Sequence, residues 1–126
     1  MDEKSDIDFE IQFFEGVLTK RPRFIEALIH LGDLYTKKGL YSQGLEIDQQ
    51  LSALRPDDPT VHYNLACSYS LIVDIEKALS ALKKAIILGY GDFSHVEKDN
   101  DLENLKKDER FQDYWAKLKT EKLKKQ

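Results

Sequence analysis

Cysteine, proline and glycine are all scarce in this sequence of 126 residues, and each scarcity excludes a class of protein. The single cysteine, Cys67, cannot form an internal disulfide or supply the several thiolates of a cysteine-built zinc site. Three prolines and six glycines are too few for a loop-rich β-sandwich or a disordered linker. Apolar runs are only a few residues long, so we expect no membrane-spanning segment and no membrane partner.

The N-terminal stretch is acidic and contains no apolar segment of the kind that a secretory signal needs. We therefore expect the protein to reside in the cytoplasm. The length fits one domain, and a chain of this length can bury a sizeable core without a second domain.

The formal net charge of −4 combines two oppositely charged ends. Residues 1–20 contain six acidic and two basic residues, whereas residues 106–126 contain eight basic and four acidic residues. This distribution excludes a uniformly basic nucleic-acid binder, so we expect no nucleic-acid partner. We interpret the basic end as a solvated terminal helix, and contact between that end and an anionic surface stays open.

The sequence repeats itself with a period of 34 residues. Pro22 and Pro56 are 34 residues apart, and each follows a stretch whose apolar side chains have helical spacing. The same shift pairs residues of similar size, namely Leu31 with Leu65, Gly32 with Ala66, Tyr35 with Tyr69, Gly44 with Ala78 and Leu45 with Leu79. A period of this length, built from two helices, is typical of tetratricopeptide repeats.

Residues 28–56 and 62–90 resemble the tetratricopeptide repeat family at many positions, and the resemblance extends over about residues 6–90. The matching positions are Leu28, Leu31, Gly32, Tyr35, Gly39, Tyr41, Gly44 and Pro56 in the first copy, and Leu65, Ala66, Tyr69, Ala78, Leu82 and Ala85 in the second. Asp48 departs from the family pattern because it replaces a large aromatic residue. Val73 replaces a turn glycine, and Tyr90 replaces the closing proline.

The resemblance implies an all-α fold, a short α-solenoid of antiparallel helix pairs that ends in a C-terminal capping helix. We expect one domain over residues 1–126, consisting of an orphan helix over 6–22, repeats over 23–56 and 57–90, and a linker with the capping helix over 91–126. Within it we expect helices over 23–38, 41–54, 59–71, 75–88 and 108–123.

Two details of the helices are predicted from single residues. The spacing of Ser5 and Asp8 resembles a capping box, which predicts that the first helix begins at Asp6. Phe111, Trp115 and Leu118 share one face of the last helix, as a solenoid cap requires, so we expect Trp115 to lie in the core.

Catalytic and metal-binding patterns are weak. Glu26, His30 and Asp33 share a helix face, which is compatible with a metal site, but stable sites usually recruit ligands from more than one helix. A pair of Cys67 with His30 of the neighbouring helix stays open, although free cysteines usually pack as small hydrophobes. No glycine-rich phosphate loop is present. We therefore predict no enzyme activity, no cofactor and no metal.

In the tetratricopeptide family, the first helix of each repeat lines a concave surface that binds peptides. Carried over by position, the predicted peptide-binding residues are Glu26, Ile29, His30, Asp33, Lys37, Thr60, Tyr63, Asn64 and Cys67. Asn64 matches a position where the family often bonds the peptide, and a structural hydrogen bond between helices is an equal alternative. Ile29 and Asp33 replace the Lys and Asn of the family's chaperone-tail clamp, so a neutral or basic, partly aromatic segment is the expected ligand.

Two functions follow from these observations. The first is a non-catalytic adaptor that binds a peptide or helix of an unidentified protein partner on its concave face. The alternative is a self-associating structural or scaffold protein, a homo-oligomer whose exposed terminal helices meet head to tail. Phe9, Phe13 and Phe14 on the first helix and the opposite charges of the two ends favour this alternative.

Overall fold

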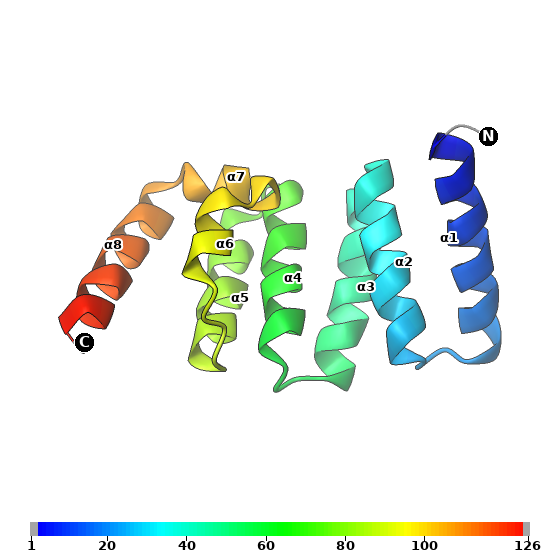
Figure 1. The fold of residues 1–126 in the computed structure, drawn as a ribbon, viewed down its shortest axis with the longest axis horizontal. Coiled ribbons are helices and arrows are strands. Elements are labelled where there is room, and N and C mark those ends of the chain that lie inside the picture. The colour runs from blue at the N-terminus through cyan, green and yellow to red at the C-terminus, as the bar shows by residue number, and fades with distance from the viewer. Residues whose placement is uncertain (1–2, 125–126) are drawn as a thin grey trace.

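The computed structural model describes residues 3–124 as a row of antiparallel helices (Figure 1), with side chains described over 6–124. No residue of this range lies in a β-strand, and the predicted all-α solenoid is confirmed. The first helices are α1 (Glu3–Lys20), α2 (Ile25–Lys38), α3 (Tyr41–Leu54), α4 (Pro59–Leu71) and α5 (Ile75–Ile87). After them come α6 (Phe93–Lys98), a 3₁₀ turn η1 (Asn100–Leu102), α7 (Glu103–Lys106) and α8 (Glu109–Lys124).

Helix boundaries agree with the sequence at α3 and α4, which begin and end at the predicted residues. The prediction that the first helix begins at Asp6 is wrong, because α1 begins at Glu3. The side chain of Ser5 lies outside the described residues. Helix α2 begins at Ile25 because Arg21 and Phe24 first close a turn, in which the Phe24 N–H donates to the Arg21 carbonyl (3.1 Å).

Aspartate side chains start the later helices. Asp58 accepts from the N–H groups of Thr60 (2.9 Å) and Val61 (3.3 Å), and Pro59 occupies the first helical position. Asp92 accepts from the His95 N–H (3.0 Å) at the start of α6. These bonds satisfy amides that a helix start leaves without intrahelical partners, which fixes where each helix begins.

Close helix contact in the first pair depends on two glycines. A Cβ atom at Gly44 would lie 3.0 Å from Thr36 Oγ1 of α2, and one at Gly32 would lie 3.2 Å from Ile47 Cγ2 of α3. Both helices therefore approach more closely than side chains at these positions would permit, as the small residues in the repeat predict.

Two apolar clusters lie along the row. The first, which we call the N-terminal cluster, joins α1, α2 and α3 and includes Ile11, Leu28 and Leu51. The second, the C-terminal cluster, joins α4 and α5 to the segments after them and includes Leu82 and Trp115. Trp115 is only 7% exposed, which confirms its predicted place in the core.

Helix starts keep the 34-residue spacing from α2 onward. Helices α2, α4 and α6 begin at residues 25, 59 and 93, and α3, α5 and α8 begin at residues 41, 75 and 109. The segment predicted as a linker after residue 90 thus has the register of a further helix pair. Its first helix is broken into α6, η1 and α7 (Figure 1), of which η1 and α7 pack against α4.

Candidate functional site

The row of helices forms a pocket of about 200 Å³ between α2, α4 and the segment that leads into η1. This pocket, which we call the inner groove, is rich in carboxylates. Its charged and polar lining consists of Asp33, Thr36, Lys37, Asp48, Tyr63, Asn64, Cys67, Ser68, His95, Asp99 and Asp101. Because four aspartates face one lysine, the groove favours cationic over anionic groups.

Asp48 lines the inner groove and is only 8% exposed. Its carboxylate accepts a hydrogen bond from the Ser68 hydroxyl of α4. Burial raises the pKa of Asp48 to about 6; the Ser68 bond opposes this rise and nearby Asp33 adds to it. The residue that departs from the family's aromatic pattern thus places a titratable group between α3 and α4.

Asp99 binds three side chains at the wall of the groove. The Tyr63 hydroxyl donates to its carboxylate (2.5 Å), the Cys67 thiol lies 3.7 Å from it, and His95 Nε2 lies 3.3 Å from it. The Tyr63 ring also stacks on the Tyr90 ring, with 4.3 Å between centroids. These contacts attach the segment after α6 to α4, and they bury most of Tyr63 and Cys67.

The surroundings of Cys67 disfavour the thiolate form of its side chain. Burial raises the pKa of its thiol well above the usual value, and the charges of Asp99 and Asp101 raise it further. His30 lies elsewhere, because its ring stacks on the Phe14 ring of α1 at 5.2 Å. The structure therefore does not bring together the Cys67–His30 pair that the sequence left open. Among the side chains described over residues 6–124, no group of three or more His, Cys, Asp or Glu is placed to hold a metal ion.

The nine predicted peptide-binding residues are divided by the fold. Five of them line the inner groove, namely Asp33, Lys37, Tyr63, Asn64 and Cys67. Ile29, His30 and Thr60 are exposed outside it, and Glu26 lines a different cavity. Whether these residues contact a ligand stays a prediction.

The predicted set lacks four titratable residues of the groove, namely Asp48, His95, Asp99 and Asp101. A signal for one of them was present, because Asp33, Cys67 and Asp101 are spaced by 34 residues and occupy equivalent positions of successive repeats. One further shift of the repeat would have found Asp101.

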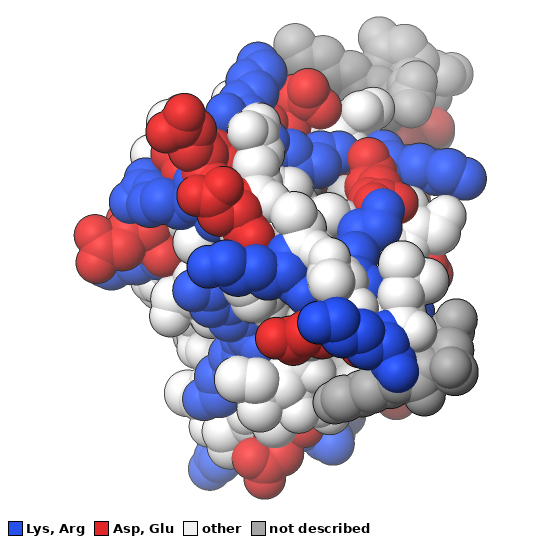
Figure 2. All heavy atoms as spheres, turned by 90° about the vertical axis from the view of Figure 1, so that its left-hand side faces the viewer, with Lys and Arg blue, Asp and Glu red and all other residues white. Residues whose placement is uncertain are grey.

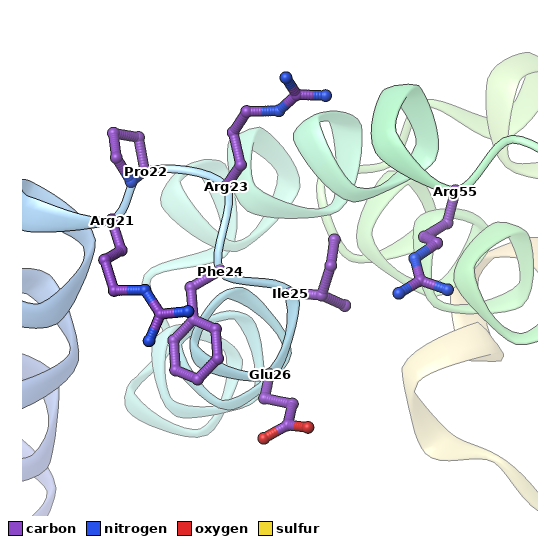
Figure 3. A pocket seen from close by; sticks show the side chains of 7 residues that line it. All are labelled: Arg21, Pro22, Arg23, Phe24, Ile25, Glu26 and Arg55. Atoms are coloured by element: carbon purple, nitrogen blue, oxygen red, sulfur yellow. The ribbon is translucent and has the colours of Figure 1, made fainter.

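A second cavity, of about 560 Å³, lies at the turn between α1 and α2 (Figure 3). Its walls include Phe24, Ile25 and Glu26 together with three arginines. The Arg21 guanidinium lies over the Phe24 ring, 4.2 Å from its centroid, and Arg55 reaches the cavity from the end of α3. In Figure 3 the Arg23 side chain points away from the other side chains, so the arginines do not converge on one point.

Across residues 3–124, none of the helices has the length and apolar character needed to cross a membrane.

The helix row and its acidic inner groove define the class of this molecule as a short α-solenoid of tetratricopeptide-like architecture. No protein-family model matches the chain. A chloroplast protein of Arabidopsis thaliana is 35% identical over 80 residues, which are 61% of this chain and 24% of that relative. The chain thus spans about a quarter of the length of the chloroplast relative.

Solved structures of MamA share the fold. MamA 41-end from Desulfovibrio magneticus RS-1 superimposes with a TM-score of 0.65 and 22% identity, over 90% of this chain and 68% of MamA. A crystal structure of MamA gives a TM-score of 0.66 and 24% identity, over 83% of this chain and 69% of MamA. At this level of identity the likeness establishes the helical solenoid fold.

Proposed function

We propose that this chain is a non-catalytic protein-interaction module, an adaptor that binds a segment of a protein partner in the inner groove. The observation that carries the proposal is the groove itself, a pocket of about 200 Å³ between α2, α4 and η1 with four aspartates in its lining. The MamA-like solenoid fold supports it, because solenoids present extended concave surfaces to their partners.

The charge of the inner groove indicates the chemistry of the ligand. Burial raises the pKa of Asp101, and the charges of Asp99 and Asp33 raise it further. The pKa of Asp48 is also raised, in part by Asp33. A cation among these carboxylates would relieve their mutual repulsion, so a lysine or arginine side chain of the partner segment fits best.

Lys37 and Asn64 add specificity to this acidic site. Asn64 lies on the wall of the groove and is half-buried, so its amide can pair with the backbone of an extended segment. Lys37, at the same groove, would repel a second cation next to the first. We therefore propose a ligand with one basic side chain flanked by neutral or aromatic residues.

We also propose that the domain divides as the sequence indicates, into an orphan helix over 6–22, repeats over 23–56 and 57–90, and a terminal part over 91–126. The helix starts support one refinement. Because α6 and α8 keep the 34-residue spacing, the terminal part is an irregular third repeat whose broken first helix closes one side of the inner groove.

Binding to an array of random twelve-residue peptides tests the proposed ligand class. The Asp33→Asn, Asp101→Asn double variant should bind the best basic peptide about tenfold more weakly, because it removes two of the four groove charges. Glu76→Gln is the matched control, since Glu76 is exposed on α5 outside the groove and its change should leave binding intact. Enrichment of acidic peptides, or equal binding by the double variant, would move the site away from the groove.

Self-association is a second candidate function, and a separate observation favours it. Phe9 and Phe13 of α1 are 71% and 57% exposed, whereas large apolar side chains at the end of a solenoid are normally covered by a polar-faced cap.

A further inference from the structure

The 34-residue spacing relates one face of α1 to the equivalent faces of α3 and α5, and both of those faces are buried. Shifted by one repeat, Glu10, Phe13, Phe14 and Val17 correspond to four buried residues of α3, namely Gly44, Ile47, Asp48 and Leu51. Shifted by two repeats, they correspond to four buried residues of α5, namely Ala78, Ala81, Leu82 and Ala85. Those faces pack against α2 and α4, which are the partner helices of α3 and α5.

In α1 this face is covered only at Phe14, whose ring stacks on His30 of α2, and Phe13 stays exposed. Phe13 is 57% exposed, its ring meets the Phe14 ring edge-on at 5.1 Å, and Val17 is only half-buried. Phe9 lies one turn before Phe13 and extends the apolar surface, while Asp6 and Glu10 border it. We call this surface the α1 face.

The other end of the row presents a complementary surface. Helix α8 turns Phe111 and Trp115 inward, and its outer side has a shallow cavity of about 330 Å³ lined by Ala116, Lys117, Thr120, Glu121 and Lys124. Two of its lining residues, Ala116 and Thr120, are small, and the volume is large enough for an aromatic ring. We call this surface the α8 face.

The α1 face and the α8 face lie in parts of the sequence with opposite net charge. Figure 2 views the molecule from the end where α8 lies, and lysine and arginine side chains extend across the middle of that surface. In the sequence, residues 106–126 carry four more basic than acidic residues, and residues 1–20 carry four more acidic than basic residues. Two α1 faces would therefore repel each other, whereas an α1 face attracts an α8 face.

We propose that this chain self-associates head to tail, with the α1 face of one copy packed on the α8 face of a second copy. Phe13 covers Ala116 and Thr120 of that second copy, and the acids beside Phe13 lie near Lys117 and Lys124. One α1 face and one α8 face stay free at the two ends of the assembly, so the contact builds open chains rather than a closed dimer. This contact rests on the self-association candidate and assigns its two surfaces, and the inner groove takes no part in it.

Two single-face variants test the proposal by sedimentation velocity at rising protein concentration. The wild type should form a ladder of masses that shortens as salt rises, because screening weakens attraction between exposed charges. Phe13→Glu, which blocks the α1 face, and Lys117→Glu, Lys124→Glu, which blocks the α8 face, should each remain monomeric. All three residues are exposed, so these changes leave the core intact, and circular dichroism checks this.

Mixing the two variants gives the decisive result. Each keeps the face that the other has lost, so the mixture should double in mass to a one-to-one dimer and stop there. Ile87→Glu is the control, because Ile87 is an 83% exposed apolar residue on α5, outside both faces, and this variant should keep the full ladder. Three results would each overturn the proposal. The wild type could be monomeric at all concentrations, or the mixture could stay monomeric. The variant with the altered α8 face could also still form a dimer while Phe13→Glu does not.

Discussion

Val73 adopts a backbone conformation that suits glycine better than a β-branched residue. Its φ is +63°, at the turn between α4 and α5 where the family pattern has glycine. A left-handed conformation costs a residue other than glycine about 1–2 kcal/mol. Because Val73 is mostly exposed, burial of its side chain stabilises the protein too little to offset this cost.

We expect Val73→Gly to stabilise the protein by up to about 1 kcal/mol, since glycine's greater freedom in the unfolded chain offsets part of the relieved strain. The midpoint of urea unfolding measures the change. Val73→Asn should give a similar gain, because asparagine tolerates left-handed backbone and avoids the extra entropy of glycine. A lower midpoint for both variants would show that the valine side chain stabilises the turn by contacts that outweigh the strain.

The buried carboxyl of Asp48 should make stability depend on pH. Its pKa is about 6 in the folded protein and 3.8 in an unperturbed chain, so between these values the folded state binds more protons. The free energy of unfolding therefore falls as pH rises from 4 through 6, and the loss is complete about one pH unit above the folded-state pKa. The loss from this one group is about 1–3 kcal/mol at pH 7.

The Asp48→Asn variant shows how much of the pH dependence of stability comes from this carboxyl rather than from the others. Asparagine keeps an acceptor for the Ser68 hydroxyl but carries no charge, so the variant should unfold at a higher temperature than the wild type at pH 7. The two proteins should have similar stabilities near pH 4. If the difference between them does not change across this range, the pKa of Asp48 is not raised by folding.

At the residue scale, the sequence could predict only one side of the inner groove. Asp33 and Asn64 were predicted because they lie on regular helices, where position in the repeat determines which face a side chain occupies. Asp99 was not, because it contacts Tyr63 across 36 residues of chain, and only the folded path of the segment after α5 brings it there. No local pattern encodes such a contact.

At the scale of elements, regular helices were predictable and the broken one was not. Helices of six and four residues are far below the length at which a helix is stable alone, so propensity and spacing give little signal for α6 and α7. They form because Val96, Leu102 and Leu105 are fully buried against α4 and α5. Tertiary packing therefore determines this part of the fold.

Ser70 of α4 anchors the broken helix. Its hydroxyl accepts from the Leu105 N–H (3.1 Å), and its carbonyl accepts from the Asn104 side-chain amide (3.0 Å). Ser70→Ala would leave the buried Leu105 N–H without a partner, which costs about 1–3 kcal/mol. The expected result is a lower melting temperature together with faster amide exchange in α7.

Ser52→Ala provides the comparison for this change. The Ser52 hydroxyl donates to the Gln49 carbonyl on the exposed side of α3, so its loss should leave stability within about 0.5 kcal/mol of the wild type. Equal effects of the two substitutions would mean that α7 is not held by Ser70.

For the whole molecule, the repeat pattern predicted the fold class because each repeat packs mainly on its neighbours. What it could not predict is the division of the apolar interior into two clusters. Leu65, Ala66 and Cys67 of α4 belong to the C-terminal cluster, whereas Val61 of the same helix belongs to the N-terminal cluster. This division depends on how closely α3 and α4 pack, which includes the buried Asp48–Ser68 hydrogen bond.

Because the apolar interior is divided into two clusters, we expect a substitution in one cluster to destabilise mainly the helices of that cluster. Trp115 packs on Phe93 (5.1 Å between ring centroids) and Phe111 (5.4 Å), and its indole N–H donates to Glu97 (2.9 Å). Trp115→Ala should destabilise the C-terminal cluster by about 3–5 kcal/mol. Amide hydrogen exchange should then rise strongly in α5 to α8, and much less in α1 and α2, because those helices do not contact the altered site.

Ile11→Ala, in the N-terminal cluster, should produce the opposite pattern, with faster exchange in α1 and α2 and little change in α8. The two variants together measure how far coupling extends along the row. If each substitution instead raises exchange equally in every helix, the two clusters unfold as one cooperative unit. In that case the α3–α4 contact, with its buried Asp48, couples the ends more strongly than nearest-neighbour packing alone would do.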